Sequence, residues 1–530
     1  MYVVGYQIER AGMRHMSNVF LKLCCFFAIT TTAVGCATNP VTGKSELSVI
    51  SENWELNTGK KQYLPMRQSQ GGDYVADPEV QDYVREVGNK LAAVSDRKLP
   101  YEFFVVNDST PNAWALPGGK IAVHRGLLTE LKSEAELAAV LGHEIVHAAA
   151  KHGAKSVQRG LLLQSTIALA NVATKNSNYT EYAQLGAELG AALITTKYGR
   201  DAERESDRYG MNYMHRAGYD PAGAVDLQQT FVNLAKDRKS GAHNGLFASH
   251  PPSQERVENN RLHAATLPKG GVRGAARYQK VIQRLKTTKP AYQAYEDATT
   301  AFAEADFAAA TLLAQKAIKI EPNEAQFHSL LGDIASINDR LTRAQKHYRH
   351  AIGLNEAFFY PHLQRGLISR ELGQMSVAKS SLNRSIELLP TATAYNALGE
   401  IAESEGNLNQ AEKYFAAASK DSGEVGQSAL TSLVKLRITE RPDAYIDTQV
   451  GLASNGEWIL ILSNTAPRAF TGVVLELAYA DSNNRVQRQQ IRIGGTLAAQ
   501  GKRRVNSGLS AGISLDAPRI TVRTLQLATN

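Results

Sequence analysis

The chain has 530 residues, of which 43% are hydrophobic and 21% are charged, and its formal net charge is +8. This composition is typical of globular protein, and the length predicts about three folded units. The charge is mild for a chain of this size. Because no nucleic-acid recognition motif accompanies it, we expect no nucleic acid partner.

The first 35 residues have the layout of a secretory signal peptide. Arg10, Arg14 and Lys22 precede an apolar run from Leu23 to Ala33, which is too short to count as a membrane span. The run leads into Ala33-Val34-Gly35-Cys36, which resembles a bacterial lipobox. The alternative is an uncleaved anchor, or a plain signal peptide followed by an incidental cysteine.

Cysteine usage agrees with this layout. Cys24 and Cys25 lie inside the signal, so cleavage would leave Cys36 alone. The mature chain would then form no intramolecular disulfide, and a chain this long can build its cores without one. Met13 and Met16 are alternative starts that give a signal of more usual length.

A turn and a short strand are predicted ahead of the central helix. Residues 116–120 (LPGGK) have turn composition, and Ile121 to Val123 follow as a strand. A strand at a sheet edge can pair with an extended peptide, which gives affinity without sequence selectivity. The alternative is a strand paired on both sides within the core sheet.

The next helix carries the most informative motif of the chain. Ser133 followed by Glu136 is typical of a capping box, and apolar residues recur after it at helical spacing. The chain then reads HEIVH from His143 to His147, the HExxH pattern of zinc peptidases. Residues four apart differ by about 40° around a helix, so both imidazoles point into one cleft. Glu144 lies about 100° from His143, where it can take a proton from a zinc-bound water.

A zinc peptidase site needs a third protein ligand and an open position for water. His152 lies about 140° around the helix from His147, so we expect it to face away. A histidine six residues after His147 would indicate a metzincin, but Gly153 stands there. Glu203 and Asp207 share a helix face, and we assign Glu203 to the metal and Asp207 to orienting a ligand imidazole. The alternative is an ordinary solvated, charged helix face.

Together these motifs resemble a known family. The HEIVH run, the Glu203 and Asp207 pair, and residues 112–119 (NAWALPGG) are similar to the gluzincin zinc peptidases related to the CAAX prenyl protease. Within that family the chain is most similar to the periplasmic branch with a tetratricopeptide tail, the β-barrel assembly-enhancing proteases. The resemblance covers residues from about 45 to 265 by motif and from about 290 to 420 by architecture.

The resemblance implies a role for each motif residue. His143 and His147 would bind one Zn²⁺ per chain, with Glu144 as general base. Glu203 would be the carboxylate ligand, and Asp207 would match the family's helper acid.

The segment from His250 to Arg256 (HPPSQER) resembles the family's His-Pro loop. This implies that His250 can be a fourth, removable zinc ligand that closes the site; a loop histidine without metal contact is the alternative. The sequence does not identify the group that stabilises the oxyanion, for which His250, Arg256 and Tyr209 are the polar candidates.

The family analogy also bears on location and on the predicted strand. It implies cleavage before Cys36 and attachment of diacylglycerol to its sulfur. Because Ala37 rather than aspartate follows, we expect a lipid anchor in the outer membrane, on the periplasmic face, with a soluble periplasmic protein as the alternative. The analogy favours the edge position for Ile121 to Val123.

Two apolar segments and a basic segment follow the motif helix. Leu161 to Ala173 and Tyr182 to Thr196 are helical in period, but each is shorter than the ~20 residues of a membrane span, so we expect them to wall or cover the cleft. Ala264 to Pro290 contains basic residues and no acid, which favours a solvated linker with a short helix. Contact with anionic lipid or an acidic partner is the alternative.

Residues 292 to about 420 indicate tetratricopeptide repeats. The pairs ending in Gly332, Gly366 and Gly399 are spaced by 34 and 33 residues. Ala344, Tyr348 and Ala351 in one unit correspond to Ala411, Tyr414 and Ala417 in another. A first unit from Tyr295 to Pro322 gives about four repeats, and such solenoids offer a groove for a protein or peptide.

The last 90 residues have a strand-like pattern that differs from the helical pattern of the repeats. Strand-like runs at 458–462, 472–479, 488–493 and 520–523 predict a small β-sandwich, immunoglobulin-like in broad architecture, with a binding or spacer role. The family members generally end at the repeats, so this module is a departure.

We therefore expect a multidomain protein with an α+β, mostly helical, zincin-type metalloprotease domain, an α-solenoid of tetratricopeptide repeats and a C-terminal β-sandwich. The expected parts are a lipoprotein signal peptide (1–35), a tether and N-terminal helix (36–70), the protease domain (71–265), a basic linker (266–290), the repeats (291–425) and the β domain (440–530).

The expected function is that of a periplasmic zinc endopeptidase acting on misfolded or stalled outer-membrane proteins, with chaperone-like client binding by the repeats. The β-barrel assembly machinery is a possible partner. The alternative is a non-proteolytic assembly chaperone or scaffold with a closed or structural zinc site.

Overall fold

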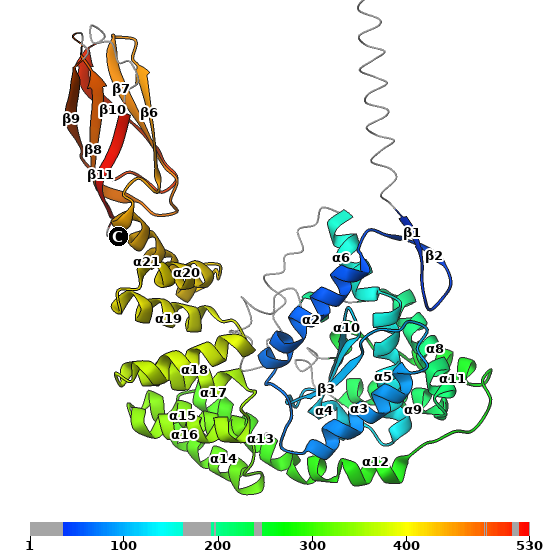
Figure 1. Ribbon diagram of the computed structural model, residues 1–530. Coiled ribbons are helices and arrows are strands. Elements are labelled where there is room, and N and C mark those ends of the chain that lie inside the picture. The colour runs from blue at the N-terminus through cyan, green and yellow to red at the C-terminus, as the bar shows by residue number, and fades with distance from the viewer. Residues whose placement is uncertain are drawn as a thin grey trace, which may run out of the picture. The chain divides into compact units, whose positions relative to one another are not determined.

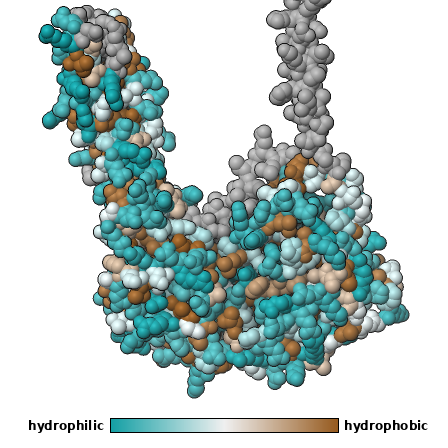
Figure 2. Space-filling model, in the orientation of Figure 1, coloured by the Kyte–Doolittle hydropathy of each residue, from teal (hydrophilic) through white to brown (hydrophobic). Residues whose placement is uncertain are grey.

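The computed structural model describes residues 35–162, 192–194, 198–237, 246–481, 483, 485–510 and 519–528 (Figure 1). These residues form two compact units that divide after Pro361. The predicted signal peptide up to residue 34 lies outside the described residues, as does most of each apolar segment (161–173 and 182–196). Among the described helices, none has the length and hydropathy needed to cross a membrane. On the face in Figure 2, hydrophilic residues predominate and hydrophobic ones lie scattered among them.

The first unit opens with a hairpin and continues as helices around a small sheet (Figure 1). The hairpin and sheet strands are β1 (Gly35–Thr38), β2 (Ser45–Ser48), β3 (Glu102–Val106), β4 (Ala113–Leu116) and β5 (Lys120–His124). The helices around them are α2 (Glu52–Ser69), α3 (Pro78–Ala92), α4 (Arg125–Glu130), α5 (Glu134–Ala149), α6 (His152–Leu162), α8 (Arg200–Arg216), α9 (Ala222–Asp237), α10 (Leu246–Ser249) and α11 (Gln254–Ala264).

The three-stranded sheet corrects one expectation. Its strand order is β3-β5-β4, with β5 parallel to β3 and antiparallel to β4. The run from Ile121 to Val123 lies in β5 and is therefore hydrogen-bonded on both sides, so it is not an edge strand. The edge position next to it belongs to β4, whose four residues are all buried.

Helix α5 is the buried centre of this unit. All sixteen of its residues are buried, and its apolar side chains belong to the largest apolar core, which also takes in α3 and α8. The predicted N-cap is confirmed, because the Ser133 side chain accepts a hydrogen bond from the Glu136 backbone N–H at 3.2 Å. The Glu136 carboxylate accepts from the backbone N–H of Lys132 at 3.1 Å, one residue before the position that a capping box requires.

The basic segment contains the predicted short helix, but it packs against the preceding domain and is not a solvated linker. It contributes α12 (Ala275–Val281) and the start of α13 (Gln283–Ala303), and both pack against the domain that carries α5. Tyr278 is fully buried and donates a hydrogen bond to the Leu128 carbonyl at 2.7 Å. The basic side chains of the segment form ion pairs with acids distant in the sequence: Arg273 with Asp220 and Asp226, Arg277 with Glu86 and Glu134, Arg284 with Glu321, and Lys289 with Glu130. The lack of acids within the segment was therefore misleading.

The repeat period is confirmed in the helices. The paired helices are α13 with α14 (Phe307–Ile320), α15 (Ala325–Ile337) with α16 (Leu341–Leu354), α17 (Phe359–Glu371) with α18 (Met375–Leu388) and α19 (Ala392–Ser404) with α20 (Leu408–Ala418), followed by α21 (Glu424–Glu440). Successive first helices begin at residues 325, 359 and 392, which are 34 and 33 residues apart.

The predicted glycines lie where paired helices touch. A Cβ on Gly332 would lie 2.5 Å from the Tyr348 ring, and one on Gly399 would lie 2.6 Å from the Phe415 ring. The expected phase in the last repeat was wrong by one residue. Ala411, Phe415 and Ala418 are the buried set there, whereas Tyr414 and Ala417 are only partly buried.

The C-terminal part of the second unit contains two three-stranded antiparallel sheets. Their strand orders are β10-β7-β6 and β11-β8-β9. The strands are β6 (Ile446–Leu452), β7 (Glu457–Asn464), β8 (Phe470–Ala480), β9 (Val486–Ile493), β10 (Lys502–Ser510) and β11 (Arg519–Leu527). Leu460 and Leu462 of one sheet share an apolar core with Val473 and Leu475 of the other. The sequence did not predict β6 and β10, whose polar residues hide the strand pattern.

Candidate metal centre

The site is built where α5 and α8 cross. Gly142 and Gly210 form the point of closest approach, because a Cβ added to Gly210 would lie 3.0 Å from the His143 backbone nitrogen. The absence of side chains there lets the backbones come close. His143 and His147 on α5 thereby face Glu203 on α8.

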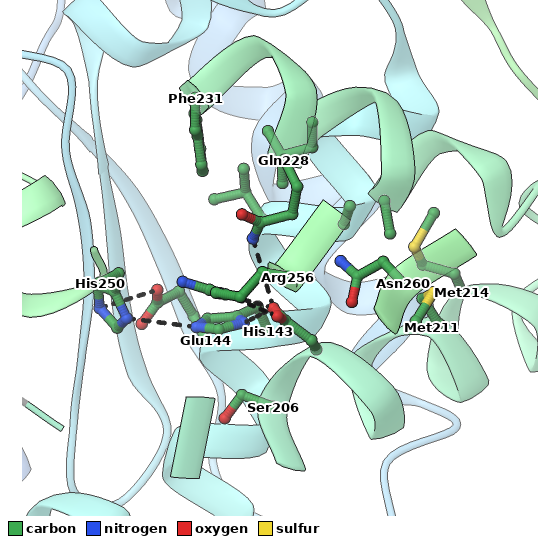
Figure 3. Close-up of a pocket in the computed structure, with 15 residues that line it drawn as sticks. His143, Glu144, Ser206, Met211, Met214, Gln228, Phe231, His250, Arg256 and Asn260 are labelled. Atoms are coloured by element: carbon green, nitrogen blue, oxygen red, sulfur yellow. Dashed lines mark hydrogen bonds and ion pairs between the residues drawn. The ribbon is translucent and has the colours of Figure 1, made fainter. Parts of the chain in front are cut away.

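Four buried side chains converge at this crossing. One ligand atom from each of His143, His147, Glu203 and His250 lies within 4.8 Å of the others. Nε2 of His143 is 3.0 Å from Nε2 of His147, 3.3 Å from Nδ1 of His250 and 3.6 Å from Oε2 of Glu203. Nδ1 of His250 is 2.9 Å from Oε1 of Glu203 (Figure 3 draws His143 and His250). All four residues are at most 9% exposed.

Asp207 and Arg256 support this group from the side. Asp207 Oδ1 lies 3.0 Å from Nδ1 of His143. Arg256, on α11, donates from Nε and Nη2 to the two oxygens of Asp207 at 2.8 Å and 2.7 Å, and its Nη1 lies 2.9 Å from Oε2 of Glu203. One guanidinium therefore neutralises two buried carboxylates, and Figure 3 shows it between His250 and Asn260.

The donor set fits a divalent transition metal. A carboxylate accepts hydrogen bonds, so the proton of neutral His143 is assigned to the Nδ1 that faces Asp207. Nε2 of His143 then presents a lone pair toward the other three donors. Two imidazoles and a carboxylate in this arrangement are the protein ligands of catalytic zinc sites, with the imidazole oriented by a second carboxylate.

Glu144 lies beside this group without joining it. Its Oε1 is 3.8 Å from Nε2 of His250, and its Oε2 is buried with no hydrogen-bond partner in the described part of the chain. Burial raises the pKa of Glu144 above its ordinary value, with Glu203 adding to the effect and the charges of His250 and Arg256 opposing it. A carboxylate with a free oxygen and a raised pKa is suited to accepting a proton.

The electrostatics of the group are dominated by burial and pairing. Burial opposes ionisation of Glu203 and Asp207, but His250 for the first and Arg256 for the second overcome it, so both pKa values lie below their ordinary range. Burial lowers the pKa of His147 well below its ordinary value, which favours a neutral imidazole. Only a neutral imidazole has a lone pair for a metal.

The prediction that His152 faces away was wrong. Its Nδ1 lies 3.0 Å from Nδ1 of His147, and its Nε2 lies 3.4 Å from Oε1 of Glu205. The predicted angle between His147 and His152 applies to one continuous helix, but α5 ends at Ala149 and α6 begins at His152. Between them Lys151 has φ of 62°, in the left-handed region, which turns the chain back toward His147.

The sequence analysis missed one further residue of the site and misplaced two others. The Tyr198 ring stacks on His147 with centroids 4.1 Å apart, and no periodic signal marks it. Arg256 was expected only as an oxyanion candidate, but it holds the two α8 carboxylates. Tyr209, another of the three oxyanion candidates, packs against the main apolar core and does not line the pocket at His143 and Glu144.

That pocket has an empty space of about 450 Å³, part of it open to solvent. Apolar side chains of α8 and α9 line much of the rest of it. Figure 3 labels Met211 and Met214 together at the right of the view and Phe231 at its top. The arrangement places a buried group of residues that could hold a metal beside a cavity.

Comparison with known proteins identifies the domain. Residues 78–262 match the model of peptidase family M48, and residues 392–420 match that of the tetratricopeptide repeat. A putative β-barrel assembly-enhancing protease of Vibrio cholerae is 30% identical over 233 residues, which cover 42% of this chain and 46% of that protein. The β-barrel assembly-enhancing protease of Escherichia coli is 27% identical, over 43% of this chain and 47% of that protein.

Those relatives are matched over only part of their length. The chain spans about half the length of the curated relatives it matches. Among solved structures, MamA is similar at 23% identity with a TM-score of 0.24, covering 28% of this chain and 86% of that chain. The family match and the HExxH helix agree on the same residues, and the chain therefore carries a peptidase family M48 domain together with tetratricopeptide repeats.

Proposed function

We propose that this chain is a zinc-dependent endopeptidase that hydrolyses peptide bonds of protein substrates. The observation that carries the proposal is the convergence of His143, His147 and Glu203 within 4.8 Å, beside a Glu144 oxygen that has no partner among the described residues. A Zn²⁺ ion held by those three residues would supply Lewis acidity toward the scissile carbonyl and an attacking water.

The residues of the chain would carry the proton transfers. Glu144 would accept the proton of the attacking water and deliver it to the leaving amine. Asp207 would hold His143 through Nδ1, and Arg256 would keep Asp207 and Glu203 ionised and in place.

His250 would be a removable fourth ligand. Its Nδ1 already lies 2.9 Å from Glu203 and 3.3 Å from His143, which supports a closed resting site. Displacement of His250 by a substrate carbonyl or by water would open the position that catalysis needs. Opening would also release Glu144 from the imidazole that lies 3.8 Å away.

The substrates would be misfolded or stalled outer-membrane proteins in the periplasm. The names of the relatives in Vibrio cholerae and Escherichia coli support this class, and the helical repeats would bind the clients. The β-barrel assembly machinery would be a partner. Cys36 would carry a lipid anchor to the outer membrane, and the C-terminal sheets would form a β-sandwich with a binding or spacer role.

A second candidate is a chaperone or scaffold whose zinc site stays closed. The observation in its favour is the burial of the donor group, with His250 4% exposed and seated against Glu203. This function would need the repeats but no hydrolysis.

Zinc content and casein cleavage separate the two candidates. We expect one zinc per chain, cleavage by the wild type that increases in His250→Ala, and no cleavage by Glu144→Gln despite full zinc content. Equal cleavage by the wild type and Glu144→Gln, or no cleavage by His250→Ala, would leave the scaffold. A purified protein that binds no zinc would remove both site assignments.

A further inference from the structure

The two histidines of the HExxH run have different partners. His143 has a carboxylate, Asp207, at its outer nitrogen. The outer nitrogen of His147, Nδ1, instead faces another imidazole nitrogen, Nδ1 of His152, at 3.0 Å. His152 is 4% exposed, so it is part of the packed interior and not a surface side chain.

Two imidazole nitrogens at this distance need one proton between them. A neutral imidazole has one N–H donor and one acceptor nitrogen. If His152 donated, the proton of His147 would move to Nε2, the atom that is 3.0 Å from Nε2 of His143 and 3.4 Å from Oε1 of Glu203. That tautomer has no lone pair for a metal. If His152 accepts, Nε2 of His147 is free.

Glu205 decides between the two tautomers. Its Oε1 lies 3.4 Å from Nε2 of His152, and a carboxylate only accepts, so it favours the proton on that nitrogen. Nδ1 of His152 is then the acceptor. Glu205 is itself fixed, because Asn39 next to β1 donates to its Oε1 at 3.1 Å.

The backbone places His152 for this contact. Lys151, with φ of 62°, separates α5 from α6, and its Nζ pairs with the buried Glu55 at 3.1 Å. The turn puts His152 beside His147 although the two are five residues apart.

We propose that His152 and Glu205 are positioning residues for His147: Glu205 fixes the tautomer of His152, which accepts the Nδ1 proton of His147 and so directs its Nε2 lone pair to the metal. The inference rests on the proposed zinc site. It adds a chain of contacts from Glu205 through His152 to His147, which we call the relay. The relay orients His147 as Asp207 orients His143.

Zinc affinity, measured by competition with a chromophoric chelator, tests the relay in the full-length protein. His152→Leu removes the acceptor, and we expect zinc to bind about 10–100-fold more weakly, the usual effect of losing such a partner. His152→Asn keeps an oxygen acceptor near the Nδ1 position and should recover most of the affinity. Glu205→Leu should weaken binding, whereas Glu205→Gln, which still accepts, should weaken it less.

The controls separate positioning from folding. His124→Asn changes another buried histidine, one that bonds to Thr110 and Gln70, and should leave zinc affinity unchanged. The absorption bands of Co²⁺-substituted protein should shift in His152→Leu and return toward wild type in His152→Asn. If His152→Leu is unstable, the zinc affinities of His152→Asn and of the two Glu205 variants, compared with the wild type, test the relay instead.

Two results overturn the relay. One is wild-type zinc affinity in both His152→Leu and Glu205→Leu, and the other is equal loss of affinity in His152→Asn and His152→Leu. If either result is obtained while the wild type binds zinc and cleaves casein, the relay is rejected and the proposed function stands. If the wild type binds no zinc, the proposed function itself is rejected.

Discussion

Nη2 of Arg256 donates to Oδ1 of Asp207 at 2.7 Å, in an interior where both residues are at most 8% exposed. The same guanidinium reaches Glu203, so one cation balances the charge of two buried carboxylates. The proposed zinc site would thus rely on a cation that does not itself bind the metal.

Replacing Arg256 by leucine should destabilise the metal-free protein. Removing one partner of a buried ion pair typically costs about 3–5 kcal/mol, because the remaining charge stays desolvated. Lysine should not restore the loss, since it lacks the forked donors that reach both carboxylates. Urea unfolding in the presence of a chelator measures the effect. Arg261→Leu on the same helix, where the ion pair with Glu258 is exposed, is the control and should change stability by less than about 1 kcal/mol.

The crossing of α5 and α8 should be intolerant of a single methyl group. In Gly210→Ala the new Cβ would meet backbone atoms of Gly142 and His143 at 3.0–3.3 Å, so the helices must separate. We expect weaker zinc binding, by about tenfold or more, because Glu203 moves with α8 away from the α5 histidines. Gly353→Ala, in helix α16, has nothing within 4 Å and should instead stabilise by about 0.5–1 kcal/mol. Unchanged zinc affinity in Gly210→Ala would contradict this account of the crossing.

Part of this site was predictable from the sequence and part was not. Ser133, the HExxH run and the Glu203–Asp207 spacing are local patterns. Ser133 caps α5 as predicted, and the structure brings the HExxH histidines together with Glu203 and Asp207. The Gly142–Gly210 contact joins residues 68 positions apart, and no local pattern marks it. His152 was misjudged because a helical wheel assumes one continuous helix, which the left-handed Lys151 breaks.

The same distinction holds for the rest of the fold. The repeat period is a local pattern, and the residues at which the helices begin confirm it. The predicted phase of the last repeat was wrong because Tyr414 and Phe415 are adjacent aromatic residues. The basic segment looked solvated because its acidic partners, such as Glu86 and Glu130, lie far away in the sequence. Charge pairing of that kind becomes visible only once the chain is folded.

Zinc should stabilise the protein through Glu203 and not through Glu144. Zinc at one hundred times its dissociation constant adds about 2.7 kcal/mol to folding if it binds only the folded chain. A rise in melting temperature on the order of 5 °C is expected for the wild type and for Glu144→Gln. Glu203→Gln should lose most of this rise. Thermal unfolding followed by circular dichroism, with and without zinc, makes the comparison. An equal rise in Glu203→Gln would show that this carboxylate is not a ligand.

Stability should also depend on pH through a carboxyl group in the repeats. Asp333 in α15 is partly buried and accepts hydrogen bonds from Tyr348 at 2.7 Å and from Tyr360 at 3.0 Å. Burial raises its pKa to about 7, with the two tyrosines opposing the shift. The folded chain therefore binds a proton that the unfolded chain has released above about pH 4, so this contribution to stability falls as pH rises from about 4 to 7 and is constant above.

The unfolding free energy should fall by at most about 1.4 kcal/mol per pH unit in that range, and by less to the extent that solvent reaches the carboxyl group. Asp333→Asn keeps an oxygen acceptor for both tyrosines but no ionisation, so it should be more stable than the wild type at pH 8 and nearly equal to it at pH 4. Asp297→Asn, an exposed carboxylate on α13, should leave the pH dependence unchanged. Urea unfolding at pH 4 to 8 measures all three proteins, and parallel pH profiles for the wild type and Asp333→Asn would refute the assignment.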